Sequence, residues 1–236
     1  MRHPKNSIFI ITALFSLATS YGQTADEIVA NHIKAIGGTD AWAKVSSIYM
    51  EGSMQVQGAE VNVTRSVIQN KGSKQEIKVA GMTGYNITTP TAGWNFMPFN
   101  GQMKPEPMTE EDLKEAQDEL DAQDELVNYK EKGSTVELVG KDDVEGTECH
   151  KLKLTFKSGK SEYLFIDPSS WLTIRQVSKQ KANGQEIETT TNFGNYQKTP
   201  EGLLVPMSIT LPFGELIISK VEVNKKIDEG IFKPSN

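Results

Sequence analysis

Apolar and polar side chains alternate with a period of two over most of the chain after residue 46. In the first such stretch Ile48, Met50 and Met54 alternate with polar neighbours, and Gln57–Gly58 follows as a turn. This period predicts strands with one buried face, and the short turns between them predict antiparallel neighbours. The eleven or twelve expected strands cover residues 46–56, 61–68, 76–79, 85–89, 94–99, 134–140, 149–156, 162–167, 172–179, 186–196, 203–211 and 215–224.

A meander of this size leaves exposed edges unless it curls, and closing or half-closing the sheet removes them. Helices are expected at 24–36, where Thr24 can cap the first turn, at a short segment from 39 to 45, and after Thr109. The expected fold class is therefore mainly β with helices (α+β). It is a large curved antiparallel sheet that forms a half-open barrel covered by helices.

The first 22 residues have the pattern of a secretory signal peptide. A short basic start is followed by an apolar run from Ile8 to Ala18 and a small-x-small site ending at Gly22. The run is too short to span a bilayer, which takes ~20 helical residues. We expect cleavage after Gly22, leaving 23–236 as a single soluble domain in the periplasm, without a stable membrane anchor.

An acidic segment interrupts the strands. Residues 106–125 contain ten acidic side chains and one basic residue, Lys114, whereas the whole chain has a net charge of −6. We expect residues 106–127 to be a helical excursion from the sheet, and the acidity argues against a nucleic-acid partner. The segment could be a lid, a docking face for a basic partner or a solvated helix.

Catalytic and metal-binding patterns are weak. Outside the leader the chain has two histidines, His32 and His150, and its one cysteine, Cys149, adjoins His150 in a strand, so the two side chains point to opposite faces. Metalloprotease, nucleophile-elbow, phosphate-loop and dinucleotide-binding motifs do not occur in the sequence. We expect no catalytic residue, metal or cofactor; a hydrolase would require two acids converging in a cleft with raised pKa values.

Three stretches resemble the LolA/LolB-like family of outer-membrane lipoprotein-sorting proteins. They are TGYNITTP with AGWNFMPF at 83–99, VEGTECHKLKL with YLFIDP at 144–168, and GLLVP with VEVNKKIDEGIFKP at 202–234. The resemblance covers nearly all of the chain after the leader. It implies an eleven-stranded half barrel, capped by helices, with an apolar cavity for acyl chains. It also implies lipoprotein or lipid cargo, an inner-membrane transporter and an outer-membrane acceptor as partners.

The resemblance also implies a residue near the second turn of the sheet that holds the lid. The family has an arginine there, whereas this chain reads NKGSK at 70–74, so Lys71 is the nearest match. A lysine lacks the planar donor fork of arginine, which puts an equivalent latch in question.

Candidate cavity residues follow from strand parity. Arg65 has the parity of its valine neighbours and, if it points inward, needs an acidic partner or a ligand headgroup. Each apolar candidate could equally be ordinary core. The candidates are Met50, Met54, Val61, Val63, Arg65, Trp94 and Phe96. The resemblance therefore implies a non-enzymatic carrier of lipidated protein or acyl chains; the alternative is an envelope β-module that binds a protein through its acidic segment.

Overall fold

The strands form one antiparallel sheet, in a computed structural model that describes residues 23–182 and 185–235. Its order is β6-β5-β4-β3-β2-β1-β13-β12-β11-β10-β9-β8-β7, so the first and last long strands pair at its centre. The strands are β1 (Ser47–Val56), β2 (Ala59–Ile68), β3 (Gly72–Val79), β4 (Met82–Thr88), β5 (Gly93–Phe96), β6 (Glu106–Pro107), β7 (Thr135–Val144), β8 (Thr147–Thr155), β9 (Ser161–Ile166), β10 (Thr173–Ala182), β11 (Gln185–Lys198), β12 (Leu204–Leu211) and β13 (Gly214–Val223). The signal-peptide prediction lies outside the described residues.

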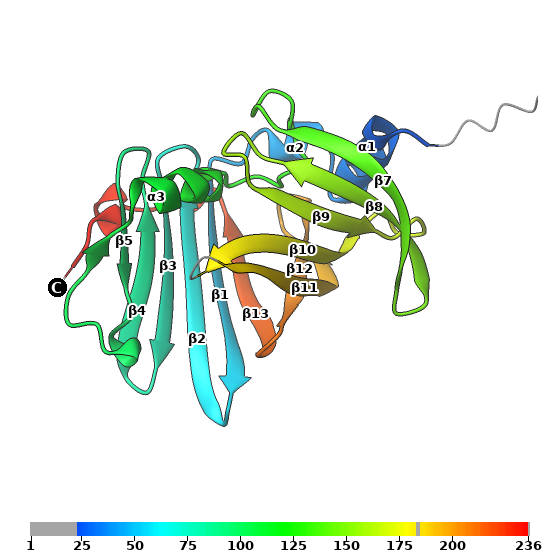
Figure 1. The fold of residues 1–236 in the computed structure, drawn as a ribbon. Helices are drawn as coiled ribbons and strands as arrows, with labels where there is room; N and C mark the ends of the chain where they lie inside the picture. Colours follow the sequence, from blue (N-terminus) through cyan, green and yellow to red (C-terminus); the bar gives the residue numbers. More distant parts are fainter. Residues whose placement is uncertain (1–22, 183–184, 236) are drawn as a thin grey trace, which may run out of the picture.

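The predicted strand count needs correction. The described chain contains thirteen strands rather than about eleven, and the sheet is open because its edge strands, β6 and β7, do not pair with each other. Strand β6 has only two residues and lies in a stretch rich in proline, glycine and asparagine, so no alternation could mark it. The mainly β, antiparallel and curved character is as predicted (Figure 1).

The helices are short. Helix α1 (Ala25–Ala35) begins with a capping box between Thr24 and Glu27, and α2 (Thr39–Trp42) follows it. The acidic segment forms helix α3 (Glu110–Ala116), capped by Thr109, and the 3-10 helix η2 (Gln117–Leu120). The predicted excursion is thus helical only from 110 to 120, and the chain continues to residue 134 mainly as turns. Two more 3-10 helices are η1 (Pro98–Asn100) and η3 (Glu229–Phe232).

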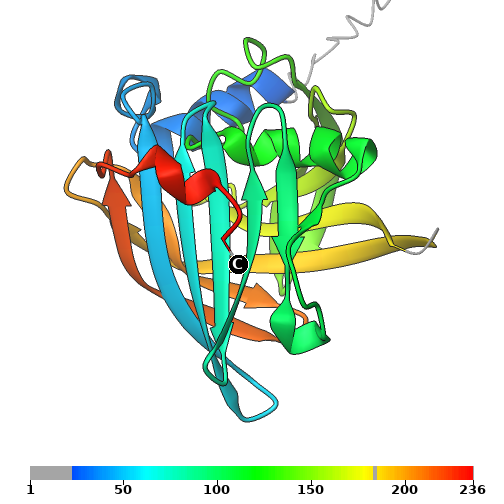
Figure 2. The ribbon, with the colours of Figure 1, turned by 90° about the vertical axis from the view of Figure 1, so that its left-hand side faces the viewer.

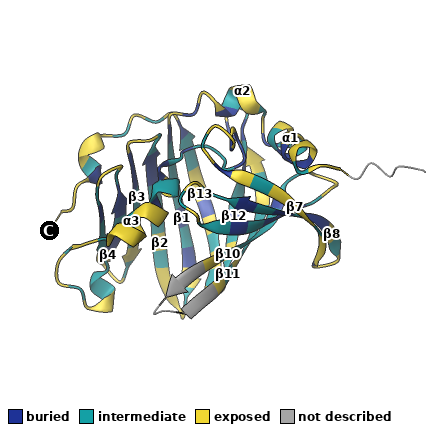
Figure 3. Ribbon diagram, turned by 45° about the horizontal axis from the view of Figure 1, so that its top comes forward, coloured by how far each residue is buried: buried dark blue, intermediate teal, exposed yellow. Residues whose placement is uncertain are grey.

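Helices and sheet make two layers at one end of the strands. Figure 1 shows α1, α2 and α3 gathered along the top of the curved sheet, on its concave side. One core cluster packs Ile36 and Trp42 against Val67 of β2 and Leu203, and a second packs Ile28 and Val29 of α1 against β8 and β9. The buried residues of β2 and β3 accordingly lie at the ends of these strands near the helices (Figure 3).

The convex face has its own cover. The C-terminal segment with η3 crosses the outside of the strands (Figure 2), where Phe232 packs with Tyr85 and Ile87 of β4. The Tyr85 hydroxyl donates to the backbone oxygen of Ser235 over 2.8 Å. A Cβ added at Gly72 would lie 2.5 Å from ring atoms of Phe232, so the segment needs a glycine beneath it.

We expect Gly72→Ala to destabilise the protein by about 1–3 kcal/mol, because the new methyl group displaces the Phe232 ring from the sheet. Urea unfolding would measure the change. Gly194→Ala is the control, since a Cβ there meets no atom within 4 Å and should change stability by less than about 0.5 kcal/mol. Equal stability of both variants would show that the C-terminal segment is not seated on β3.

Candidate functional site

The concave face carries an apolar band at the end of the strands away from the helices. Val63 of β2 lies opposite Ile77 of β3 in the register, and Val61 lies opposite both Met54 and Val79. The band ends at the turn between β3 and β4, where Met82 is 42% exposed. We define the apolar band as Met54, Val61, Val63, Ile77, Val79 and Met82. Between buried Met54 and exposed Met82 its other members are only half-buried, so this part of the face is incompletely covered.

The structure brings most of the predicted cavity residues together. Met50, Val61, Val63 and Arg65 share the concave face, because Met50 lies directly opposite Arg65 and Arg65 has the parity of Val63. Met54 shares that face but is only 5% exposed, so it belongs to the packed interior at its end of β1.

Trp94 and Phe96 lie on the other face. They pair in register with Ile87 and Tyr85, and all four pack against the C-terminal segment on the convex side. Their shared parity was predicted correctly, but their grouping with the other cavity candidates was wrong. Alternation tells which residues share a face and not which face is concave. These two aromatic side chains close the outer surface instead.

The lid has a different latch from the predicted one. We define the lid as residues 110–134, which cross the concave mouth above β2, β3 and β4 (Figure 1). Lys71 pairs with Glu229 of η3 over 2.5 Å, at an exposed site on the convex side. Gln69 instead holds the lid: its Nε2 donates to Asp121 over 2.9 Å, and its Oε1 accepts from the Ala122 backbone N–H over 2.6 Å. Sequence reasoning missed Gln69.

Further bonds hold the lid to other turns of the sheet. The backbone N–H of Asn70 donates to the Leu120 oxygen over 2.9 Å, and the Gln117 amide donates to the Thr89 oxygen over 3.2 Å. At the opposite side the Ser158 hydroxyl donates to Asp118 over 2.6 Å. The lid is therefore fastened at the β2–β3, β4–β5 and β8–β9 turns, which are far apart in sequence.

A buried ion pair joins the lid to α1. His32 is 2% exposed; its Nδ1 lies 2.8 Å from the Trp171 carbonyl oxygen and its Nε2 lies 3.5 Å from the Asp124 carboxylate. Since both ring nitrogens face acceptors, the cationic form satisfies both. Burial lowers the pKa of His32, but the charge and hydrogen bond of Asp124 outweigh it, so the pKa is raised. Burial raises the pKa of Asp124, but the charge and hydrogen bond of His32 outweigh burial, so the pKa of Asp124 is lowered.

Further carboxyl groups converge beneath the lid. Glu162 of β9 is buried and bonded to Lys160, at 2.6 Å, and to Gln176. Burial, followed by the charges of Asp124 and Glu162, raises the pKa of Glu125 well above its usual range, and burial raises that of Asp118. Glu125 and Asp118 thus have the raised pKa values that a hydrolase would require of its two acids. Among the described residues no hydrogen bond joins Glu125 to Asp118, whose carboxylate is bonded to Ser158.

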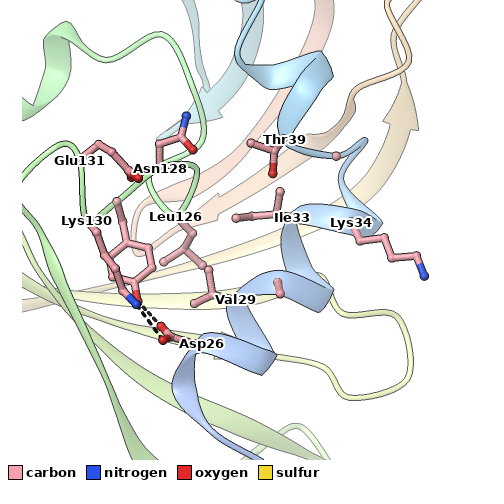
Figure 4. A pocket seen from close by; sticks show the side chains of 12 residues that line it. Asp26, Val29, Ile33, Lys34, Thr39, Leu126, Asn128, Lys130 and Glu131 are labelled. Atoms are coloured by element: carbon pink, nitrogen blue, oxygen red, sulfur yellow. Dashed lines mark hydrogen bonds and ion pairs between the residues drawn. The ribbon is translucent and has the colours of Figure 1, made fainter.

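Two pockets of about 480 and 530 Å³ lie along α1, apart from the concave candidates. They share Asp26, Tyr129 and Lys130, and the Asp26 carboxylate accepts from the Tyr129 hydroxyl and, over 2.7 Å, from Lys130. Figure 4 shows Val29 and Leu126 in the apolar wall of the first pocket. None of the predicted ligand residues lines either pocket.

The remaining chemical candidates are separate from one another. Cys149 packs on the convex side with Val144 and Phe165, whereas the His150 ring stacks on Trp171, 5.6 Å between centroids. The described residues contain no group of three or more His, Cys, Asp or Glu side chains arranged to hold a metal ion. No helix in the described ranges is long and apolar enough to cross a membrane.

Comparison with solved structures defines the class of fold. No protein-family model matches the chain, and no curated protein matches its sequence. An outer membrane lipoprotein-sorting protein domain from Vibrio parahaemolyticus superposes with a TM-score of 0.52 at 13% identity, covering 87% of this chain and 94% of that one. A LolA superfamily protein from Nitrosomonas europaea gives 0.55 at 14% identity, covering 90% and 98%.

A DUF1329 family protein from Desulfovibrio piger gives a TM-score of 0.54 at 12% identity, covering 90% of this chain and 98% of that one. At these identities the likeness establishes the fold. The chain therefore has a LolA-like fold, as the sequence resemblance predicted.

Gln69→Leu should lower the free energy of unfolding by about 1–3 kcal/mol, because it leaves the Ala122 N–H and one side of Asp121 without their partner. Lys71→Met is the matched control two residues away; it breaks only an exposed ion pair and should change stability by less than about 1 kcal/mol. Urea unfolding measures both, and hydrogen exchange should show faster opening at 120–127 in Gln69→Leu alone. A larger loss of unfolding free energy in Lys71→Met than in Gln69→Leu would contradict the assignment of Gln69 as the latch.

Glu125 should make stability fall as the pH rises. Below its ordinary pKa of 4.5 the carboxyl is protonated whether the chain is folded or not, but at higher pH the unfolded chain ionises while the folded one resists. Glu125→Gln should therefore match the wild type near about pH 4.5 and have a higher Tm near about pH 7.5. Glu119→Gln, the same carboxyl-to-amide change at an exposed site on the lid, is the control variant. A wild-type-like pH profile in Glu125→Gln would mean that Glu125 ionises freely.

Proposed function

We propose that this protein is a non-enzymatic periplasmic carrier that binds the acyl chains of lipidated protein or lipid on its concave face. The observation that carries the proposal is the apolar band, which is half-buried and incompletely covered although it lies inside a curved sheet. Acyl chains in water cost ~0.8 kcal/mol per CH₂ group, so a carrier must offer them an apolar concavity.

The similar structures support this choice of cargo. One of them is an outer membrane lipoprotein-sorting protein domain and another belongs to the LolA superfamily. A carrier of that kind would receive cargo from an inner-membrane transporter and deliver it to an outer-membrane acceptor. The proposal also rests on the secretory pattern of residues 1–22, which would place the mature chain in the periplasm.

The attachment of the lid suits a carrier, because hydrogen bonds connect the lid to the turns of the sheet. Gln69, Gln117 and Ser158 fasten it through hydrogen bonds at three turns. Such bonds contribute only ~0.5–1.5 kcal/mol each, so they can open locally without exposing the two apolar core clusters. Opening there would enlarge the entrance to the concave face.

The alternative is a module that binds a protein through the acidic segment. Six of its acids are exposed, on or beside α3: Glu106, Glu110, Glu111, Asp112, Glu115 and Glu119. A basic partner would bind them with an affinity that falls steeply with salt, whereas acyl binding would not. The two functions are compatible if the partner is the transporter or acceptor.

The carrier proposal predicts that Val63→Ser with Ile77→Ser weakens binding of a fluorescent fatty-acid probe by about ten-fold or more, since both lose apolar contact with the chain. Fluorescence titration gives the Kd, and circular dichroism with thermal unfolding checks the fold.

Ile217→Ser is the matched control. Ile217 is 46% exposed and lies outside the apolar band, so its loss should leave probe affinity unchanged. Equal affinity of the wild type and the double variant would move the site away from the band. A wild type that binds no acyl probe and is purified without lipid would contradict the carrier function itself.

A further inference from the structure

One row of the concave face is polar. In the register, Arg65 of β2 lies opposite Gln75 of β3, Gln75 lies opposite Asn86 of β4, and Asn86 lies opposite Asn95 of β5. Residues directly opposite in antiparallel strands have Cβ atoms ~4.5–5.5 Å apart on the same face. We define the polar row as these four side chains, which lie side by side across four strands.

The polar row is unpaired within the described part of the chain. All four side chains are half-buried, and in the parts of the chain that the structure describes no hydrogen bond or ion pair is found for any of them. By contrast Lys74 and Glu76, on the other face of β3, pair over 3.1 Å. Among the described residues the fully buried side-chain polar atoms without a partner are Thr88 Oγ1 and His150 Nε2, so the polar atoms of the row remain accessible and are free to bind a ligand.

The lid does not supply the missing charge. No ion pair joins Arg65 to a lid acid in the described ranges; Asp121 is bonded to Gln69 and Lys132, and Asp124 is paired with His32. The next row toward the helices consists of Val67, Ser73 and Thr88, all buried. The polar row therefore lies at the inner limit of the accessible face.

The apolar band begins directly beyond the polar row. Val63 and Ile77 form the adjoining row, and Val61 and Val79 form the one after it. Four residues of strand at ~3.4 Å each place the last row about 14 Å from Arg65. A ligand that satisfies both features has a hydrogen-bonding head and an apolar chain running along the strands toward Met82.

We propose that the concave face recognises amphiphiles with an anionic headgroup and holds them in one orientation, the head on the polar row and the chain on the apolar band. The Arg65 guanidinium offers the two-pronged contact that carboxylates and phosphates accept, and the amides of Gln75, Asn86 and Asn95 can donate to the remaining oxygens. This inference rests on the proposed acyl-chain binding and adds the headgroup class and the orientation.

The test compares dodecanoate, dodecyl phosphate and dodecanol, all below their micelle concentrations, by displacement of a fluorescent probe. The wild type should bind the two anions at least ten-fold more tightly than the alcohol. Arg65→Met should abolish that preference by lowering the affinity for both anions to near that for dodecanol, and Arg65→Lys should restore part of the preference. Inorganic phosphate alone should compete at least a hundred-fold more weakly than dodecyl phosphate.

A second variant keeps Arg65 and supplies a counter-ion. Gln75→Glu places a carboxylate directly opposite Arg65, so affinity for both anions should fall toward that of dodecanol. Asn62→Asp adds the same charge at an exposed site on the other face of β2 and should change nothing. Thermal unfolding of each variant confirms that it is folded.

The outcomes separate the two proposals. Equal binding of anions and alcohol by the wild type would overturn the headgroup assignment and leave acyl binding intact. Phosphate competing as strongly as dodecyl phosphate would indicate a free-anion site instead of an amphiphile site. Failure of all three amphiphiles to bind would overturn the carrier function as well.

Discussion

A sheet of thirteen strands that curls without closing presents a concave face larger than its short helices can cover. Helices α1 and α2 and the lid cover only the end where Val67, Leu203 and the side chains of β8 and β9 are buried. Beyond them the strands continue for several residues with half-buried valines and isoleucine. This mismatch between the area of the sheet and its cover creates both the packed core and the incompletely covered apolar band.

The cover itself combines apolar packing with polar fastening. Leu126 and Val127 of the lid are fully buried, yet its connections to the sheet turns are made by Gln69, Gln117 and Ser158. Polar bonds depend on geometry and on charge, so they define one closed position and couple it to the protonation of groups beneath the lid. Glu125 and His32 both have raised pKa values, so a rise in pH weakens that closed position through each of them. The same segment presents its remaining acids to solvent.

The two faces of β2 to β5 have separate roles. Outward-facing aromatic residues, including Trp94 and Phe96, are sealed by the C-terminal segment and Phe232. The inward-facing residues are divided along the strands into a polar row and an apolar band. The C-terminal segment covers the convex face at β4 and β5, whereas the concave face has a half-buried polar row beside the apolar band. The register between strands, rather than any single strand, produces the polar row.

The sequence by itself determined the strands other than β6, their antiparallel arrangement and which of their side chains share a face, since a period of two is a local property. The register places Met50, Met54, Val61, Val63 and Arg65 on one face, in agreement with their parity in the sequence, and Thr24 and Thr109 marked the helix starts. Only the tertiary structure decided that Trp94 and Phe96 face outward, because alternation leaves the choice between two faces open. It also decided that Gln69 rather than Lys71 meets the lid. That contact joins residues about fifty positions apart, and its partner depends on where the curled sheet brings the chain back.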